Sequence, residues 1–380
     1  METELLYRMA LTRVKGIGPV HARSLLNHFG EASAIFKAKS DHLVKIPGIT
    51  PNLRQAITTF DNYGKIEEEI SFLKKHRIQS LFFTDPEYPQ RLLPIKNAPT
   101  LLFYRGNADL NTTRIVSIVG TRTPTEYGRQ TTAVLIQDLR DSNILVLSGM
   151  AYGIDTLAHA NAFQTGLPTV GILGHGLDRI YPTENTALAK KIVTHGGLLT
   201  QFGAGTDADE CNFPVRNRVV AGMCDAIIVV ETGVHGGSLL TTSNAIDYGK
   251  KVFAVPGRLT DPLSKGCNKL IAEGMASPFI DGPQFLKEMQ WDRNPQIVLP
   301  TQPELFKTLA PQPPVAPTNI SPEADQILTL LGRHDELSFD KLTTLTSLPA
   351  NTLSLPLFQL ELRGIIQTLP GKRFRINRLQ

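Results

Sequence analysis

The sequence of 380 residues has few cysteines and no long apolar run, and these absences exclude several classes of protein. Cys211, Cys224 and Cys267 form no CxxC pair, so neither a disulfide framework nor a cysteine-rich zinc site is expected. No apolar stretch approaches the roughly 18 residues of a membrane-spanning helix. The first residues also lack the charged-then-apolar pattern of a signal peptide. We therefore expect a cytoplasmic protein with no membrane contact.

A strong excess of one charge is also missing. Lysine and arginine number 39 against 35 aspartates and glutamates, a net charge of +4. Such a balance permits nucleic acid as a partner but does not imply it. The length exceeds that of one ordinary hydrophobic core, so two or three domains are expected.

Residues 1–78 are expected to form a helical domain. The turn Gly16-Ile17-Gly18 resembles a helix-hairpin-helix motif of the SAM-like kind, and residues 47–49 resemble a weaker second copy. In such a hairpin, the turn and the next helix N-terminus can hold a DNA phosphate. The alternative is a tight interhelical turn that binds nothing.

Residues 79–290 change to apolar strands that do not alternate, each followed by a helix. The strands are expected at 114–120, 144–149, 168–174, 197–202, 225–231 and 251–257. This pattern predicts an α/β domain of Rossmann-like type, with a doubly wound, mainly parallel sheet that helices cover on both faces.

The last part of the chain predicts a linker and a small domain. Residues 291–322 are rich in proline and read as an extended linker. Residues 323–380 predict three short helices and a hairpin around Pro370-Gly371, which is the pattern of a winged helix. Pro356 falls inside the third expected helix, where proline is disfavoured, and could shift its start.

The segments that follow the expected strands contain the best candidates for a binding site. Ligands of open parallel sheets bind at the carboxyl ends of the strands. The segments there are 120–122, 148–155, 174–178, 213–218 and 232–238, and nearly all are rich in glycine and lead into a helix. Glycine lets backbone N–H groups approach a phosphate, and a helix N-terminus favours negative charge. The edge of the sheet could thus hold several phosphates.

No pattern indicates a cofactor, a metal or a catalyst. The first turn is "GTRTPTEYG" rather than GxGxxG, and no P-loop occurs, so neither a dinucleotide nor a nucleoside triphosphate is expected. His159 is expected on a helix face rather than as a ligand. Asp155 is expected to be an N-cap or first-turn carboxylate. We find no general base and predict that the protein is not an enzyme.

Five sequence blocks point to a known family. "VGTR", "SGMAYGID", "GLDRIYP", "NFPVRNRVVAG" and "GGSLLTTSNAIDYGKKVFAVPG" resemble the signature blocks of the DprA/Smf family of bacterial DNA-processing proteins, and the likeness covers residues 88–278. The resemblance implies a domain that binds single-stranded DNA, forms a homodimer and loads the RecA recombinase during natural transformation. It implies neither a cofactor nor chemical turnover.

The resemblance also implies which residues hold the DNA. These are Gly120, Thr121, Arg122, Phe213, Arg216, Asn217 and Arg218, together with Gly236, Gly237 and Ser238. Ser148 and Gly149, after the second strand, join them as candidates. Single-stranded DNA needs cations along its backbone and an apolar face for its bases, which the arginines and Phe213 could supply.

One of the two arginines on the expected helix could instead be structural. Arg216 and Arg218 point about 200° apart on a helix, so one could form an ion pair with Glu231 or Asp225 while the other binds DNA.

The sequence departs from the pattern of this family at two positions, and part of it also resembles another family. His175 stands where the family more often has a small or hydroxyl residue, and Glu210 brings an acid that weakens phosphate attraction. The stretch 216–241 also resembles LOG-type phosphoribohydrolases, which cleave nucleoside monophosphates. The acid that should follow their glycine loop is missing here.

Overall fold

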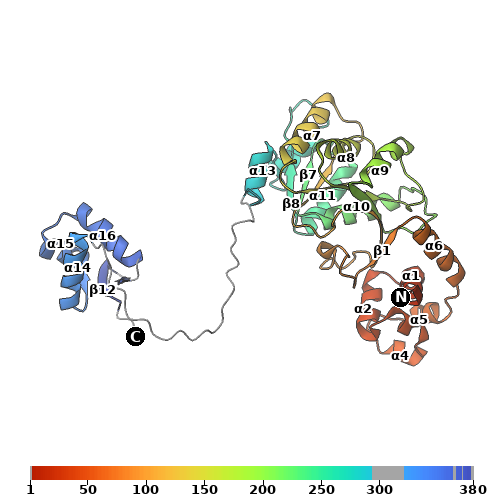
Figure 1. Ribbon diagram of the computed structural model, residues 1–380, viewed down its shortest axis with the longest axis horizontal. Coiled ribbons are helices and arrows are strands. Elements are labelled where there is room, and N and C mark those ends of the chain that lie inside the picture. Colours follow the sequence, from red (N-terminus) through yellow and green to blue (C-terminus); the bar gives the residue numbers. More distant parts are fainter. Residues whose placement is uncertain (1, 293–320, 363–364, 370, 378–380) are drawn as a thin grey trace. The chain divides into compact units, whose positions relative to one another are not determined.

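The computed structural model describes residues 2–292, 321–362, 365–369 and 371–377 (Figure 1). The chain forms two compact units, residues 1–297 and 298–380, which are described separately. The predicted linker at 291–322 falls largely on residues outside the described ranges. The helical and α/β segments, predicted as two domains, pack within one unit, and the predicted boundary between them stays a prediction.

The first unit begins with helices, as predicted. They are α1 (Glu2–Arg13), α2 (Pro19–Phe29), α3 (Ala32–Lys37), α4 (Ser40–Val44), α5 (Pro51–Thr58) and α6 (Tyr63–Lys75). Gly16, with φ of 85°, turns the chain between α1 and α2. The buried side chains of these helices share one core with Phe82, Leu101 and Phe103 of the adjoining sheet. The hairpin is therefore anchored on the sheet.

Within residues 2–292, nine strands form one sheet in the order β1-β2-β6-β5-β4-β3-β7-β8-β9. They are β1 (Gln79–Phe82), β2 (Leu101–Gly106), β3 (Ile115–Val119), β4 (Leu145–Ser148), β5 (Thr169–Leu173), β6 (Gly196–Thr200), β7 (Ala226–Val229), β8 (Lys251–Ala254) and β9 (Ser277–Pro278). The strands from β3 to β9 run parallel, whereas β2 runs antiparallel to both of its neighbours, β1 and β6. The mainly parallel sheet is as predicted, and the antiparallel pair was not foreseen.

Helices cover both faces of the sheet, which confirms the doubly wound fold. One face packs against α7 (Glu126–Leu139), α8 (Ile154–Thr165) and α13 (Gly282–Glu288). The other packs against α10 (Asn212–Met223), α11 (Gly237–Asp247) and α12 (Lys265–Ala272). The short α9 (Thr186–Ile192) lies beside α8 and covers the end of the sheet at β5 and β6. Within the described residues, no helix has the length and apolar character needed to cross a bilayer.

The order of strands creates a switch point between β3 and β7. From β3 the chain moves outward through β4, β5 and β6, and then returns to place β7 on the other side of β3. The loops after β3 and β7 therefore diverge to opposite faces. A crevice at the carboxyl ends of two such strands is the usual ligand site in open α/β sheets.

The second unit has the element order of a winged helix, as predicted. Its elements are α14 (Pro322–Arg333), β10 (Leu337–Ser338), α15 (Phe339–Thr346), α16 (Ala350–Leu362), β11 (Ile366–Leu369) and β12 (Arg373–Ile376). The strands form a small antiparallel sheet in which β12 lies between β10 and β11. Pro356 lies in the interior of α16 and does not mark its start.

A buried histidine ties α8 to the sheet. His159 is fully buried, and its Nδ1 lies 2.7 Å from the hydroxyl of Thr169, which itself donates to the carbonyl of Val146. Because the hydroxyl proton of Thr169 is used in the bond to Val146, the imidazole of His159 donates from Nδ1 to the Thr169 oxygen. Burial lowers the pKa of His159 to about 3, so the ring is neutral in the folded protein. His159 is a core residue on a helix face, as predicted.

We predict that acid destabilises the first unit through His159. A histidine in an unfolded chain has a pKa of about 6.5. Below that pH, His159 is protonated in the unfolded state but stays neutral in the folded state. This contribution to stability is complete above pH 6.5 and is lost as the pH falls towards 3, by up to about 1.4 kcal/mol per pH unit. The measurement is the unfolding temperature between pH 7 and pH 4. His159→Gln should show a shallower decline than the wild type, and exposed His42→Gln should not. Equal slopes for all three proteins would contradict the prediction.

Candidate nucleic-acid interface

A cavity of about 670 Å³ opens at the switch point, outside the carboxyl ends of β3 and β7. We refer to it as the strand-end cavity. The residues of the candidate set that line it are Gly120, Thr121, Arg122, Gly149, Phe213, Arg216, Asn217, Gly236, Gly237 and Ser238. Loops separated by more than a hundred residues in sequence thus meet around one space. The structure brings these candidates together, and whether they bind DNA stays a prediction.

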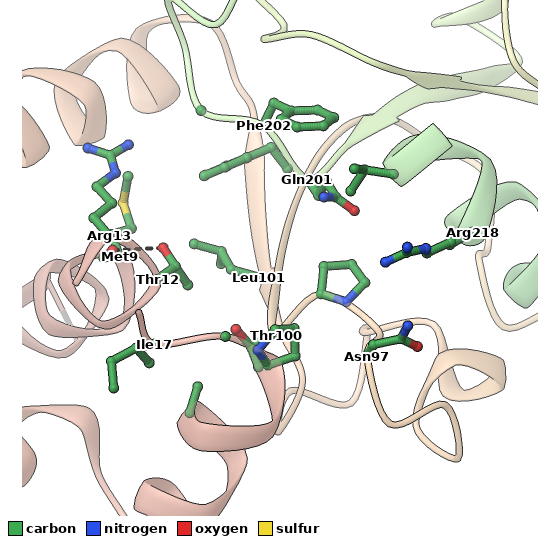
Figure 2. A pocket seen from close by; sticks show the side chains of 17 residues that line it. Met9, Thr12, Arg13, Ile17, Asn97, Thr100, Leu101, Gln201, Phe202 and Arg218 are labelled. Carbon is green, nitrogen blue, oxygen red and sulfur yellow. Dashed lines mark hydrogen bonds between the residues drawn. The ribbon is translucent and has the colours of Figure 1, made fainter. Parts of the chain in front are cut away.

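Ser148 and Arg218 lie outside this cavity. Ser148 is fully buried and donates its hydroxyl to the carbonyl of Ile118 at 2.6 Å. Arg218 is exposed on the other side of α10 and lines a separate cavity of about 370 Å³, between the α1–α2 hairpin and the sheet. Figure 2 shows this second space, the hairpin cavity, with Arg218 reaching toward it from the side opposite Arg13 and Met9.

An exposed cation and two aromatic rings lie together at the strand-end cavity. The guanidinium of Arg122 lies 5.6 Å from the ring centroid of Phe213. The ring of Tyr181 stacks on Phe213 with centroids 6.1 Å apart and an interplanar angle of 27°. Tyr181 lines the same cavity and is 46% exposed. A Cβ at Gly174 would come within 2.9 Å of the Phe213 ring, so glycine lets the ring lie against the loop after β5.

Arg216 is structural as well as cavity-lining. It is only 6% exposed, and its guanidinium donates to the carbonyls of Gly149 and Ile172, the latter at 2.5 Å. The carbonyls lie just beyond β4 and near the end of β5, so one cation joins the two strand ends. Burial lowers the pKa of Arg216 although Asp155 raises it. This guanidinium is therefore held beneath the surface and is far less accessible than that of Arg122.

Asp155 is the negative partner of this buried region. Its carboxylate accepts hydrogen bonds from the N–H groups of Gly149 and Ala151, at 3.1 and 3.2 Å. Burial raises the pKa of Asp155, and the neighbouring Arg216 opposes that shift. Asp155 is a first-turn carboxylate of α8, as predicted, but it closes the preceding loop and does not cap the helix.

The two acids predicted as arginine partners on this side have other roles. Asp225 accepts a two-pronged hydrogen bond from Arg91, at 2.7 and 2.9 Å. Glu231 is buried and accepts from the N–H of Thr125 at 3.0 Å and from its hydroxyl at 2.5 Å. The carboxylate thereby lies at the N-terminus of α7, where negative charge is favoured. The predicted ion pairs of Arg216 or Arg218 with these acids are wrong.

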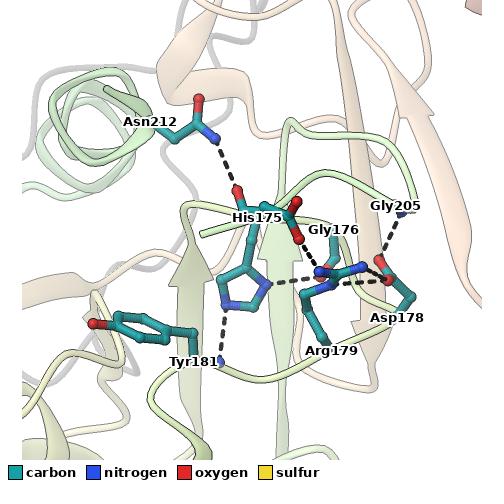
Figure 3. A network of polar contacts seen from close by, with 8 residues as sticks. His175, Gly176, Asp178, Arg179, Tyr181, Gly205 and Asn212 are labelled. Atoms are coloured by element: carbon teal, nitrogen blue, oxygen red, sulfur yellow. Dashed lines mark hydrogen bonds and ion pairs between the residues drawn. The ribbon is translucent and has the colours of Figure 1, made fainter. Parts of the chain in front are cut away.

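A polar network fixes the loops that precede Phe213 and Tyr181 (Figure 3). The imidazole of His175 is buried, donates from Nδ1 to the carbonyl of Gly176 at 2.8 Å and accepts at Nε2 from the N–H of Tyr181 at 3.2 Å. Burial lowers the pKa of His175, and only the neutral ring can accept at Nε2 from the N–H of Tyr181. His175 therefore positions Tyr181.

The same network ties the loop after β6 to the loop after β5. Arg179 binds both Asp178 and Asp207, and Asp178 accepts from the N–H of Gly205 at 2.9 Å. Asn212, at the start of α10, donates to the carbonyl of Asp207 at 3.1 Å. These contacts fix the start of the helix that carries Phe213.

The N-terminus of α11 opens into the strand-end cavity. Gly236 is its N-cap and offers no side chain, and a Cβ at Gly237 would meet no atom within 4 Å. The hydroxyl of Ser238 donates to that of Thr232 at 2.8 Å. The open space beside Gly237 thus lies at a helix N-terminus that lines the same cavity as Arg122, an arrangement suited to an anion.

The cavity also contains groups that oppose an anion. Glu210 lines it and is exposed, and the buried carboxyl of Asp155 lines it as well. In the part of the chain that the structure describes, no three His, Cys, Asp or Glu side chains gather as they would around a metal ion. The arginines and the helix N-terminus therefore share this edge of the sheet with acids.

Comparison with known proteins gives matches along most of the chain. A family model described as DNA recombination-mediator protein A matches residues 79–290. Models for a DprA winged helix domain and for a SAM-like helix-hairpin-helix tandem match residues 310–372 and 9–58.

Individual relatives agree with these matches. Protein Smf of Synechocystis is 30% identical over 98% of this chain and 99% of its own length. DNA processing protein DprA of Streptococcus pneumoniae is 37% identical over 63% of this chain and 84% of its own.

Two solved structures are also similar. One is DprA from Streptococcus pneumoniae, with a TM-score of 0.63, 32% identity and coverage of 74% of this chain and 97% of that one. The other, from Helicobacter pylori, is described as showing the single-stranded DNA binding mode of DNA processing protein A. Its TM-score is 0.52 at 29% identity, and the match covers 57% of this chain and 98% of that one.

We predict that Gly149→Ala destabilises the protein. The added Cβ would collide with the Arg216 guanidinium and lie 2.7 Å from the Asp155 carboxylate, so the buried charge pair would have to move. We expect a loss of about 2 kcal/mol or more in the free energy of unfolding, measured by chemical denaturation. Gly237→Ala, at a position with open space in the same cavity, is the control and should change stability by less than about 0.5 kcal/mol. Equal effects of the two substitutions would show that the packing around Arg216 is not tight.

Proposed function

This chain belongs to the DNA recombination-mediator protein A family, and from that premise we propose that it binds single-stranded DNA at the strand-end cavity, protects it and loads RecA during natural transformation. The observation that carries the DNA site is Arg122. Its guanidinium is exposed beside Phe213, and no carboxylate partner is found for it among the described residues. An unpaired cation at a switch point is available to a ligand anion.

Phosphates are proposed to bind between Arg122 and the N-terminus of α11. An arginine can donate two parallel hydrogen bonds to phosphate oxygens, and the helix terminus adds backbone donors and a favourable dipole. Gly237 leaves room for the backbone of the DNA to approach. Since these contacts address the sugar-phosphate chain, they are independent of base sequence.

Bases are proposed to stack on Tyr181 and Phe213. Every base has a flat face, and stacking on an aromatic side chain contributes about 1–3 kcal/mol per base without selecting a sequence. A duplex hides those faces within its own stack, so the aromatic pair favours a single strand. Arg216 is assigned a positioning role, because its guanidinium joins the ends of β4 and β5 beneath these rings.

We propose that the protein has no chemical turnover. The phosphoribohydrolase alternative is not favoured, because the segment 237–243 after the glycine loop, "GSLLTTS", contains no acid. Glu231, the acid before that loop, is buried against the N-terminus of α7 and accepts hydrogen bonds from the N–H and the hydroxyl of Thr125. A buried, engaged carboxylate cannot reach a glycosidic bond in the cavity.

RecA loading and the homodimer rest on the family alone, whereas the proposed cytoplasmic location rests on the sparse cysteines and the lack of long apolar runs. The dimer is proposed to form through the α/β part of the first unit. A mass measurement by light scattering at micromolar concentration tests it, and a monomer would remove the dimer from the proposal. Pull-down of RecA by the full chain on single-stranded DNA tests the loading.

Single-stranded DNA should bind more tightly than duplex, and binding should weaken with salt. Each phosphate that the protein neutralises releases counterions, so the logarithm of affinity should fall with the logarithm of salt concentration by about 0.7 per contact. Fluorescence anisotropy with labelled oligonucleotides measures both effects. Affinity that is independent of salt, or equal for single strand and duplex, would sink the proposed DNA site.

Arg122→Ala should weaken single-strand binding about tenfold to a hundredfold, since hydrogen bonds to charged groups contribute about 1.5–3 kcal/mol. The matched control is Lys372→Ala in the winged helix, which should have little effect. Deleting everything after Pro322 should also cost less than Arg122→Ala, because the first unit has its own hydrophobic cores. If the deletion abolishes binding while Arg122→Ala leaves it intact, the DNA site lies in the winged helix.

A further inference from the structure

The hairpin cavity is a separate hollow of the first unit, and the proposed function does not use it. Its volume is about 370 Å³. Arg13, Ile17 and Gly18 line it from the helical hairpin, and Gln201, Phe202 and Arg218 line it from the sheet and α10. Both walls belong to the same compact unit, whose helices share a core with β1 and β2.

The charges of this cavity favour an anion. Two arginines line it, and no aspartate or glutamate is among the described residues of its wall. Arg13 is engaged by Glu69, which lies outside the lining. Arg218, in contrast, is exposed, and no ion pair or hydrogen bond of its side chain is found in the described part of the chain. One positive charge at the mouth is therefore free for a ligand.

The interior of the cavity suits a flat group with polar edges. Its walls combine apolar side chains, among them Ile17 and Phe202, with the polar groups of Thr100 and Gln201. The volume falls within the usual range of about 300–1,000 Å³ for small-molecule sites. A nucleobase matches this mixture, since its faces are apolar and its edges carry hydrogen-bonding groups.

One helix separates this cavity from the strand-end cavity. On α10, Phe213 and Asn217 line the strand-end cavity, whereas Val215 and Arg218 line the hairpin cavity. A helix with its side chains is about 10–12 Å across, so the two spaces open on either side of a single element. A flexible polyanion bound on one side needs only to pass over α10 to reach the other.

We propose that the hairpin cavity is a second subsite for the same DNA strand. Arg218 binds a phosphate at the mouth, and the adjoining base enters between the helical hairpin and the sheet. This inference rests on the proposed function, because it extends the strand held at Arg122. It gives the helical hairpin a role in DNA binding through the wall that it contributes.

The test compares oligo-dT of about 4 nucleotides with oligo-dT of about 16 nucleotides, lengths that bracket the usual footprint of one single-strand module. For Arg218→Gln in the full chain, we expect the affinity for the longer strand to fall about tenfold, and its salt slope to decrease by about 0.7 for the lost phosphate. The affinity for the short strand, which the strand-end cavity holds alone, should not change. Val215→Trp, which fills the hairpin cavity without removing a charge, should likewise affect only the longer strand.

The matched control is Arg140→Gln, which removes the same charge after the C-terminus of α7, at the opposite edge of the sheet. It should change neither affinity, since its exposed pair with Asp141 contributes little. If Arg218→Gln weakens both lengths equally or changes neither, the second subsite is wrong. If the wild-type protein binds neither length, the proposed function itself fails. If Arg122→Ala loses short-strand binding, the proposed function is supported, whether or not Arg218→Gln has any effect.

Discussion

The edge of the sheet at the strand-end cavity depends on one buried cation. Arg216 is almost inaccessible, and a charge in that position is costly unless it is paired and hydrogen-bonded. Its guanidinium meets that requirement with the carbonyls of Gly149 and Ile172 and with the nearby carboxylate of Asp155. The same contacts join the ends of β4 and β5 to α10 and to the first turn of α8. Removing either charge would leave the other buried with its backbone hydrogen bonds but without the opposite charge beside it.

Some glycines at this edge of the sheet are needed for close packing, and others leave space for a ligand. Gly149 has no space for a Cβ, because Arg216 and Asp155 occupy it. Gly153, with φ of 79°, lies where a Cβ would meet the backbone of Thr121 and Arg122. Open space beside the backbone is found at Gly237, on the far side of the cavity. The backbone at Gly149 and Gly153 is thus closely packed, whereas the N-terminus of α11 at Gly237 stays accessible.

Much of this architecture follows from local sequence patterns, and the rest depends on distant contacts. The parallel strands and the loops at their ends are predictable because apolar runs and glycine-rich segments are local signals. The antiparallel β1 and β2 are not, because neither shows a clear alternation or a hairpin turn. Helical spacing separates Arg216 from Arg218 but does not say which is buried, and Asp225 binds Arg91, which lies 134 residues away in sequence. Tyr181 was not predicted as a site residue, because its stacking on Phe213 depends on how two loops fold together.

The lengths of the outer strands have a consequence for how copies of this protein can associate. At one side the sheet ends in β1, which has four residues, and at the other in β9, which has two. Such short edges offer few free backbone groups to a neighbouring chain, and natural proteins use this device against aggregation. Copies of this chain are therefore poorly equipped to join their sheets edge to edge. A contact between two copies would instead use side chains of helices and loops, and such a contact can form and separate without any change in the sheet.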